Sequence, residues 1–333
     1  MTLPPYRPLG STGLSVSPFC LGTATFGGQC DERESFGIMD RALDLGITFF
    51  DTADKYPLGS GPADAGVTES IIGRWWKGRR DQIILLSKVH GATGPRPWDG
   101  GLSRRHIMNA VEASLRRLNT DYLDIYQLHR PDPATPIDET LSTLDDIVRQ
   151  GKVRYIGCAN FLAYQLATAL GRSDVNRWHR FTSLQSRYNL LFREHERELF
   201  PLSRQEGIGI LAYNVLAAGM LTGKHRPDGS SQVGTRFSKP GIGDLYLQRY
   251  WSDDKFAAIE QLRAIADDAG CSLAALATAW TLGRPGISSV ILGATRPEHL
   301  DQSVASSALV LEPSILEAAN TVTHTFRLGD ALQ

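Results

Sequence analysis

Short apolar runs recur along the chain, and each is followed by a longer polar or amphipathic stretch. β-Branched and aromatic residues are common in these runs, as they are in strands. Several runs are apolar at every position, which is typical of parallel strands buried on both faces. The runs cover residues 19–23, 48–51, 83–89, 123–129, 153–158, 183–186, 208–213 and 290–293. They predict eight parallel strands.

Five of the intervening stretches have the apolar spacing of amphipathic helices. They cover residues 34–45, 103–118, 137–149, 195–205 and 254–268. Ser103 suits the N-cap of the second stretch, and glycine follows the others closely, as it does at many helix C termini. Repeated strand–helix alternation predicts an α/β fold, a (β/α)8 TIM barrel formed by a single domain over residues 1–333. An open doubly wound sheet is the alternative, but the G-x-G-x-x-G turn that usually follows its first strand is absent from the sequence.

Three segments interrupt this alternation, at residues 54–66, 90–101 and 224–252. Each follows a predicted strand, so we expect long βα loops at the C-terminal face of the barrel, where such loops form substrate walls and lids. Residues 7–17 contain Gly10 and Gly13 and predict an N-terminal β-hairpin that closes the bottom of the barrel. The tail from Pro313 predicts a last helix outside it.

Composition excludes several classes of function. The net charge of −1 argues against a nucleic-acid surface and against a basic membrane-binding face. No stretch approaches the roughly 18 apolar residues of a membrane span, and the first residues lack the apolar core of a signal peptide. The four cysteines form no C-x-x-C pair and fit no zinc motif, so we expect inert thiols in a cytoplasmic protein without a metal site.

Four residues that carry chemistry fall at or just after strand ends. Asp51 ends the second predicted strand, Lys88 nearly ends the third, and His129 ends the fourth. Tyr56 follows Asp51 on the next loop. Because a barrel places its reactive groups at the C-terminal ends of its strands, we expect these side chains to converge.

Together the four residues suit the reduction of a carbonyl, which needs a hydride at carbon and a proton at oxygen. A free phenol has a pKa of about 10, and the Lys88 ammonium would lower the pKa of Tyr56. Asp51 would hold the ammonium, and His129 would hydrogen-bond the substrate oxygen. Taken singly, each residue also has a structural explanation: a helix cap, a loop aromatic or a core histidine. The combination therefore carries the hypothesis.

Several longer motifs resemble the aldo-keto reductase superfamily. They are GITFFDTADKY (46–56), LLSKV (85–89), DYLDIYQLHRPDP (121–133), GKVRYIGCANF (151–161), LQSRYNLL (184–191), GILAYNVLAAGMLTGK (209–224) and SSVILGATRPEHL (288–300). The resemblance spans essentially the whole chain and is strongest to bacterial reductases similar to potassium-channel β subunits. WDGGLSRRHI (98–107) also resembles branches that act on keto-sugars. The resemblance implies the same catalytic tetrad of Asp51, Tyr56, Lys88 and His129.

The resemblance also implies a nicotinamide cofactor and the residues that bind it. Asn160 and Gln185 would meet the carboxamide, and Tyr213 would stack on the ring. The pyrophosphate would lie near Leu216, Gly219, Lys224 and Arg236, and the 2′-phosphate near Gly293, Thr295, Arg296, His299 and Ser303. Thr23 and Asp51 complete this expected cofactor set. A helix N-terminus and the Arg296 fork favour anions, so NADP(H) is the expected cofactor and NAD(H) the alternative.

The chain departs from the usual family pattern at several of these positions. Ala159 replaces a serine before Asn160, and Asn214 and Val215 replace Ser-Pro after the stacking tyrosine. His299 and Ser303 replace the usual residues at the adenine end, which bears on the choice between NADP and NAD. Ala24 stands where related proteins often have tryptophan, and the space left beside the nicotinamide predicts a bulky substrate.

Three functions remain in competition. The first is an NADPH-dependent reductase of a bulky, cyclic or sugar-like aldehyde or ketone, and the second is an NAD-dependent dehydrogenase of a sugar or alcohol. The third is a cofactor-sensing regulatory subunit of the channel β type. A barrel hydrolase would need paired carboxylates at strand ends, and the sequence has none. The expected partner is a small-molecule carbonyl or alcohol, and a monomer is the default assembly.

Overall fold

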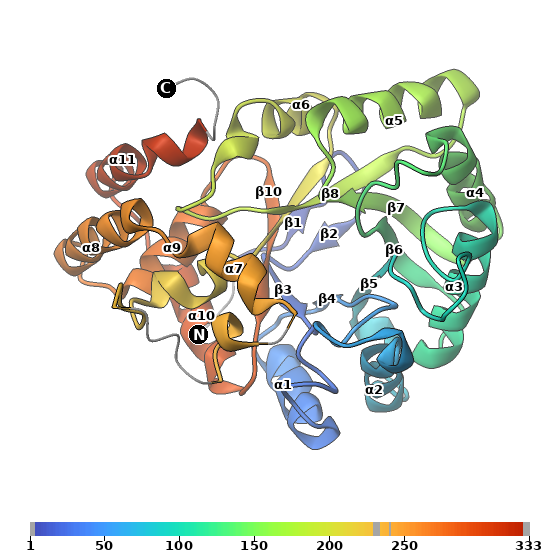
Figure 1. The fold of residues 1–333 in the computed structure, drawn as a ribbon, viewed down its shortest axis with the longest axis horizontal. Helices are drawn as coiled ribbons and strands as arrows, with labels where there is room; N and C mark the ends of the chain where they lie inside the picture. The colour runs from blue at the N-terminus through green and yellow to red at the C-terminus, as the bar shows by residue number, and fades with distance from the viewer. Residues whose placement is uncertain (1–3, 229–233, 240, 329–333) are drawn as a thin grey trace.

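Eight parallel strands close into a barrel, as Figure 1 shows in a computed structural model that describes residues 4–228, 234–239 and 241–328. The strands lie in the order β10-β3-β4-β5-β6-β7-β8-β9. Their bounds are β3 (Phe19–Gly22), β4 (Phe49–Asp51), β5 (Ile84–Val89), β6 (Leu123–Leu128), β7 (Val153–Ala159), β8 (Phe181–Arg187), β9 (Gly209–Tyr213) and β10 (Ile287–Gly293). The predicted (β/α)8 barrel and each of its eight strands are confirmed.

An outer layer of helices covers the barrel (Figure 1). The α-helices are α1 (Glu32–Asp44), α2 (Val67–Trp75), α3 (Arg104–Leu118), α4 (Ile137–Arg149), α5 (Ala163–Asn176), α6 (Leu199–Gln205), α7 (Gly243–Tyr250), α8 (Asp253–Asp268), α9 (Leu273–Leu282), α10 (Glu298–Ala305) and α11 (Pro313–Val322). Short 3-10 helices are η1 (Pro62–Asp64), η2 (Arg80–Gln82), η3 (Glu194–Glu196), η4 (Ala217–Thr222), η5 (Arg236–Ser238), η6 (Ser306–Ala308) and η7 (His324–Arg327). All five predicted helices are present, and Ser103 caps α3 by accepting from the backbone N–H of His106.

The segment at residues 224–252 is more ordered than predicted. Its described part contains η5 and the two-turn helix α7, where the sequence pattern indicates only a loop. The glycines of this segment favour a loop, because glycine is a poor helix former. Figure 1 places α7 beside the strand ends rather than in the ring of outer helices.

The N-terminal hairpin closes one end of the barrel, as predicted. Strands β1 (Arg7–Pro8) and β2 (Ser15–Val16) pair antiparallel and form a small separate sheet. Leu9 and Val16 are fully buried against interior side chains at the lower ends of the strands, which include Cys20, Phe49, Leu86, Ile125 and Leu211. At Gly10 a Cβ atom would come within 2.2 Å of the Gly207 carbonyl oxygen, so the contact requires glycine there.

A buried ion pair joins α2 and α3 behind β5. The Glu69 side chain has no exposed surface, and its Oε2 lies 2.6 Å from Arg117 Nη2. Its Oε1 accepts a 2.6 Å hydrogen bond from Ser87, the residue before Lys88. Gly66 leaves room for the Arg117 side chain, because a Cβ atom at residue 66 would lie 2.2 Å from Arg117 Nε. The pair therefore fixes the two helices against the strand that carries Lys88.

Replacing Arg117 by alanine leaves the Glu69 charge buried without its partner. Loss of one member of such a pair typically costs about 3 kcal/mol, so we expect Arg117→Ala to lower the free energy of unfolding by that amount in urea denaturation. Arg74→Ala is the matched control, because Arg74 pairs with Glu32 at the surface and should leave the free energy of unfolding nearly unchanged. Equal losses in the two variants would contradict a special role for the buried pair.

Candidate active site

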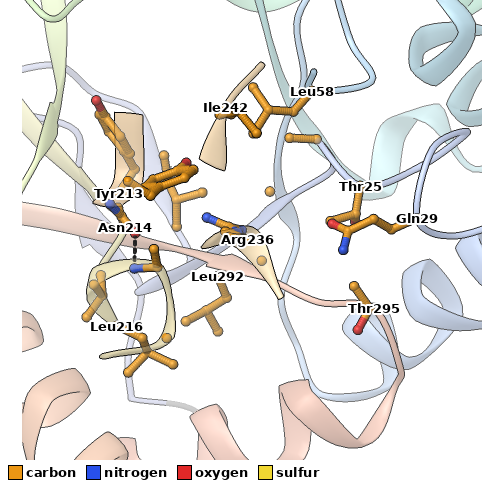
Figure 2. Close-up of a pocket in the computed structure, with 18 of the residues that line it drawn as sticks. Thr25, Gln29, Leu58, Tyr213, Asn214, Leu216, Arg236, Ile242, Leu292 and Thr295 are labelled. Atoms are coloured by element: carbon orange, nitrogen blue, oxygen red, sulfur yellow. Dashed lines mark hydrogen bonds between the residues drawn. The ribbon is translucent and has the colours of Figure 1, made fainter. Parts of the chain in front are cut away.

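A cavity of about 440 Å³ opens at the C-terminal ends of the barrel strands. Figure 2 shows part of its lining, with residues from β9, β10 and the loops that follow β3 and β4. Three of the four predicted catalytic residues line it, namely Asp51, Tyr56 and His129, and Lys88 lies behind Asp51. The predicted cofactor residues that also line it are Asn160, Gln185, Tyr213, Leu216, Gly219, Lys224, Arg236, Gly293, Thr295, His299 and Ser303.

Lys88 and Asp51 form a buried ion pair at the base of this cavity. Lys88 has no exposed surface, and its Nζ lies 2.7 Å from Asp51 Oδ1. The ammonium also donates to the Thr52 carbonyl at 2.8 Å, and Gln185 Nε2 donates to Asp51 Oδ1 at 2.7 Å. Burial lowers the pKa of Lys88, but Asp51, with smaller contributions from Tyr56 and Cys20, acts against burial and the pKa is raised overall. The lysine is therefore a permanent ammonium.

Tyr56 lies against this ammonium and is 8% exposed. Lys88 Nζ is 5.1 Å from the centre of the phenol ring, and His129 contacts the ring edge-on with 5.8 Å between centroids. Burial raises the pKa of Tyr56, and Lys88 offsets only part of that rise. The ammonium lowers the pKa of Tyr56, as the sequence predicts, but burial is the larger effect and the pKa lies above its ordinary value. Tyr56 therefore holds its proton at neutral pH.

His129 is a neutral imidazole at the cavity wall. Burial and the positive charge of Lys88 hold its pKa well below the ordinary histidine value of 6.5. Its Nδ1 is buried and has no hydrogen-bond partner within the described chain. The imidazole can therefore orient an oxygen without adding charge to the site.

Asn160 joins this wall to the end of β9. Its Oδ1 accepts a 2.7 Å hydrogen bond from the Tyr213 hydroxyl, and its Nδ2 donates to the His129 carbonyl at 2.9 Å. The backbone N–H of Asn160 donates to the Gln185 carbonyl at 3.0 Å. The two amide residues and the tyrosine that the resemblance assigns to the nicotinamide are thus brought together by three adjacent strands.

The loop after β9 and Arg236 line the next part of the cavity. Ala217, Ala218 and Gly219 all have positive φ, at 48°, 59° and 106°, so the chain turns sharply here. In Figure 2 the Arg236 side chain lies between the loop with Asn214 and Leu216 and the loop with Thr25 and Gln29. A Cβ atom on Gly293 would come within 3.0 Å of Arg236 Nη2. Cationic groups and exposed backbone at this point fit a phosphate.

Two predicted cofactor residues lie outside the cavity lining. Arg296 is exposed, and Thr23 is fully buried and donates from its hydroxyl to the Asp51 carbonyl at 2.9 Å. Thr23 therefore positions the backbone of Asp51. At the far end of the cavity, Thr295 contacts the His299 ring, and burial lowers the pKa of His299. A 2′-phosphate at this end would meet Thr295, neutral His299 and Ser303 before Arg296.

Two sets of residues that line the cavity were not predicted from the sequence. Ile242, Leu245, Tyr246 and Arg249 line the cavity from α7. Their spacing of three, four and seven residues is the signature of one helix face, and it could have revealed both the helix and its role. Thr25, Gln29 and Leu58 were missed because loop positions carry no periodic signal; they lie on the loops after β3 and β4.

The residues present fit a nicotinamide dinucleotide. The cavity continues from the tetrad, past hydrogen-bonding amides and an aromatic ring, to a cationic turn and a small polar end. Within residues 4–228, 234–239 and 241–328, no group of three or more His, Cys, Asp or Glu side chains could hold a metal ion. In the same residues no helix has the length and apolarity to cross a membrane.

Comparison with known proteins gives one consistent family. Residues 18–322 match the aldo/keto reductase family. The chain is 38% identical over 325 residues to a Bacillus subtilis protein named "Uncharacterized oxidoreductase YrpG", with 95% of each chain covered. It is 36% identical to a probable voltage-gated potassium channel subunit beta of Arabidopsis thaliana, covering 96% and 97% of the two chains. It is 33% identical to the versiconal hemiacetal acetate reductase of Aspergillus parasiticus, covering 94% and 95%.

The low pKa of His129 can be measured directly by NMR of the histidine ring nitrogens. We expect His129 to stay neutral as the pH falls from 8 to about 6, where an ordinary histidine with a pKa of about 6.5 is already mostly protonated. Lys88→Met removes one cause of the depression, so the His129 pKa should rise towards the ordinary value. His129→Gln assigns the signal. Titration of His129 near pH 6.5 in the unmodified protein would contradict this electrostatic account.

Proposed function

Because the chain belongs to the aldo/keto reductase family, and is thus an oxidoreductase by family, we propose that it reduces an aldehyde or ketone to an alcohol with NADPH. One observation carries the proposal: a protonated phenol, a buried ammonium and a neutral imidazole meet at one end of the cavity. These are the groups that a carbonyl oxygen needs when it receives a proton. The named reductases and oxidoreductases among the relatives support the same class of reaction.

The cofactor, when bound, supplies a hydride to the carbonyl carbon. Tyr56 then donates its proton to the carbonyl oxygen, and the O–H bond of the phenol breaks as the alcohol O–H bond forms. The phenolate that remains is stabilised by the Lys88 ammonium, which Asp51 and the Thr52 carbonyl hold in place. His129 hydrogen-bonds the same oxygen and fixes its direction. A solvent proton afterwards restores Tyr56.

Side chains along the cavity would hold the cofactor in a defined order. Asn160 and Gln185 would bind the carboxamide, and Tyr213 would lie against the ring. Lys224 and Arg236 would bind phosphate oxygens, and Thr295, His299 and Ser303 would surround the far end. Lys224 and Arg236 would serve the pyrophosphate that both cofactors share, so the choice of NADPH rests on the far end, where Thr295 and Ser303 line the cavity and Arg296 lies nearby to meet a 2′-phosphate. Use of NAD(H) by a sugar or alcohol dehydrogenase is the alternative.

The substrate that we propose is bulky, cyclic or sugar-like. Ala24 lines the cavity close to Leu58 and Ile242, which places a small apolar side chain where a larger one would fill space. The named substrate of the Aspergillus relative, a versiconal hemiacetal acetate, is consistent with a large ligand in this family. We further propose a cytoplasmic location, which four free cysteines support, and a monomer as the default assembly.

Tyr56→Phe tests the proposed role of the phenol. We expect the variant to bind NADPH as the unmodified protein does, and to lose roughly 100-fold or more in the rate of carbonyl reduction. Stopped-flow absorbance of NADPH measures the rate, and fluorescence titration with NADPH and NADH measures binding. Tyr164→Phe is the control, because Tyr164 is 67% exposed and is not among the residues that line the cavity.

Three outcomes of the same titrations would redirect the proposal. Tighter binding of NADH would favour the dehydrogenase. Tight NADPH binding without turnover of any aldehyde or ketone in a broad panel would favour a regulatory subunit of the channel β type. Binding of neither cofactor would overturn a nicotinamide-dependent function.

Ala24→Trp tests the predicted room for a bulky substrate. An indole at this position would fill the space beside Leu58, so kcat/KM for cyclic or aromatic carbonyls should fall about tenfold or more, because overfilling a packed site costs 1–3 kcal/mol. The kcat/KM for two- or three-carbon aldehydes should not fall. Ala24→Ser is the matched control of similar size. A native preference for the small aldehydes would overturn the bulky-substrate proposal.

A further inference from the structure

Helix α7 presents one face to the cavity. Ile242, at its N-cap, and Leu245 and Tyr246 give this face an apolar stretch, and Arg249 follows one turn later. This face of α7 is therefore an apolar part of the cavity wall with the Arg249 guanidinium at its end. Such a combination suits a ligand with an apolar body and an anionic group at one end.

The end of α7 that carries Arg249 is fixed to the barrel. The neighbouring residue Tyr250 has no exposed surface, and its hydroxyl accepts hydrogen bonds from Asn189 Nδ2 at 3.0 Å and Asn214 Nδ2 at 2.9 Å. Asn214 directly follows Tyr213 at the end of β9. Arg249 therefore stands on a preorganised support, which lowers the entropy cost of holding a ligand.

Arg249 lies on the side of the cavity where the reaction takes place. The next residue, Tyr250, accepts its hydrogen bond from Asn214, which directly follows Tyr213, and Tyr213 and Arg249 line the same cavity. Tyr213 in turn bonds Asn160, which bonds the His129 carbonyl. The two other cations of the lining, Lys224 and Arg236, lie beside Gly219 and Gly293 instead.

No protein group neutralises Arg249 in the described chain. It donates no hydrogen bond and forms no ion pair there, although its side chain is only partly exposed. Asp51 is the one carboxylate among the described residues that line the cavity, and Lys88 and Gln185 occupy it. A guanidinium left unpaired in a partly closed cavity favours binding of an anion.

We infer that Arg249 recognises an anionic oxygen group, in the first place a carboxylate, on the carbonyl substrate. The inference rests on the proposed function and narrows its substrate class to aldehydes or ketones that also carry a negative charge. The planar guanidinium would bind the carboxylate through two parallel N–H donors, while Ile242 and Leu245 contact the apolar body. Phosphate oxygens of the cofactor share this chemistry and are the competing source of the anion.

Two aldehydes of nearly identical shape test the inference, 4-carboxybenzaldehyde and its neutral amide, 4-formylbenzamide. Charged hydrogen bonds of this kind contribute 1.5–3 kcal/mol, or roughly 10- to 100-fold. We expect Arg249→Gln to lower kcat/KM for the carboxylated aldehyde by that factor and to change the neutral one less than about twofold. Arg249→Lys keeps the charge without the fork, so it should recover only part of the loss.

Arg187→Gln is the matched control. Arg187 packs over Phe192 and near Tyr250 but does not line the cavity, so removing it changes the local charge without removing a cavity group. The ratio of the two kcat/KM values should stay as in the unmodified protein. An equal change of this ratio in the Arg187 and Arg249 variants would overturn a direct contact.

The remaining outcomes distinguish an anionic group on the substrate from the phosphates of the cofactor. They also distinguish failure of this inference from failure of the proposed function. Equal losses for both aldehydes in Arg249→Gln, with weaker NADPH binding in the fluorescence titration, assign Arg249 to the cofactor and overturn the inference. An unmodified protein that reduces the neutral aldehyde without any preference for the carboxylated one overturns the inference and leaves the proposed function standing. Benzoate binding to the NADP+ complex, lost in Arg249→Gln and retained in Arg187→Gln, supports the inference without requiring turnover.

Discussion

The ion pair between Lys88 and Asp51 is the interaction on which the site depends. Either charge alone would be too costly to bury in the barrel, since removing an ion from water costs several kcal/mol. Their 2.7 Å contact, together with the Gln185 and Thr52 hydrogen bonds, makes burial tolerable. The groups come from β4, β5 and β8 and from the residue after β4, so they meet only when the barrel is closed in its correct register. The sheet must therefore close for the charge pair to form, and the charges must pair for the closed sheet to bury them.

The buried ammonium then sets the protonation states around it. It disfavours a second positive charge, which keeps His129 neutral, and it moderates the effect of burial on the Tyr56 phenol. The result is an acid and a neutral hydrogen-bonding group beside each other near neutral pH. Two residues, Tyr56 on the loop after β4 and His129 after β6, thereby receive different roles from one charge.

Much of the fold and the tetrad could be predicted from sequence, because both follow regular rules. Strands buried on two faces leave continuous apolar runs, and reactive groups follow strand ends. The prediction was too short at β8, which covers Phe181–Arg187 instead of residues 183–186, and Ser183 and Gln185 within it are polar. These polar side chains are buried because Gln127 and Asp51 satisfy them across the barrel, and such partners are distant in sequence.

Other parts of the site depend on packing that no local pattern records. Helix α9 has apolar residues on most of its surface because β10, α8 and α10 enclose it, so its amphipathic signal is weak. Helix α5 was missed because Tyr164 and Val175 are exposed apolar residues that blur its periodicity. The resemblance directed attention to Arg296 as a phosphate ligand, whereas the cation that lines the cavity near the tetrad is Arg249 on an unpredicted helix. The sequence shows where the reactive residues lie along the chain. Only the three-dimensional structure shows which of several arginines line the cavity.

The hairpin at the closed end of the barrel has a consequence for how this protein can change. Leu9, Val16 and the paired turns at Gly10 and Gly207 lie at the end of the strands opposite the cavity and share no lining residue with it. Substitutions at the two ends should therefore combine additively, as they do for distant sites without common partners. Substitutions in the hairpin can therefore change thermal stability while substitutions around the cavity change substrate preference. Selection can act on the two ends of the barrel nearly independently.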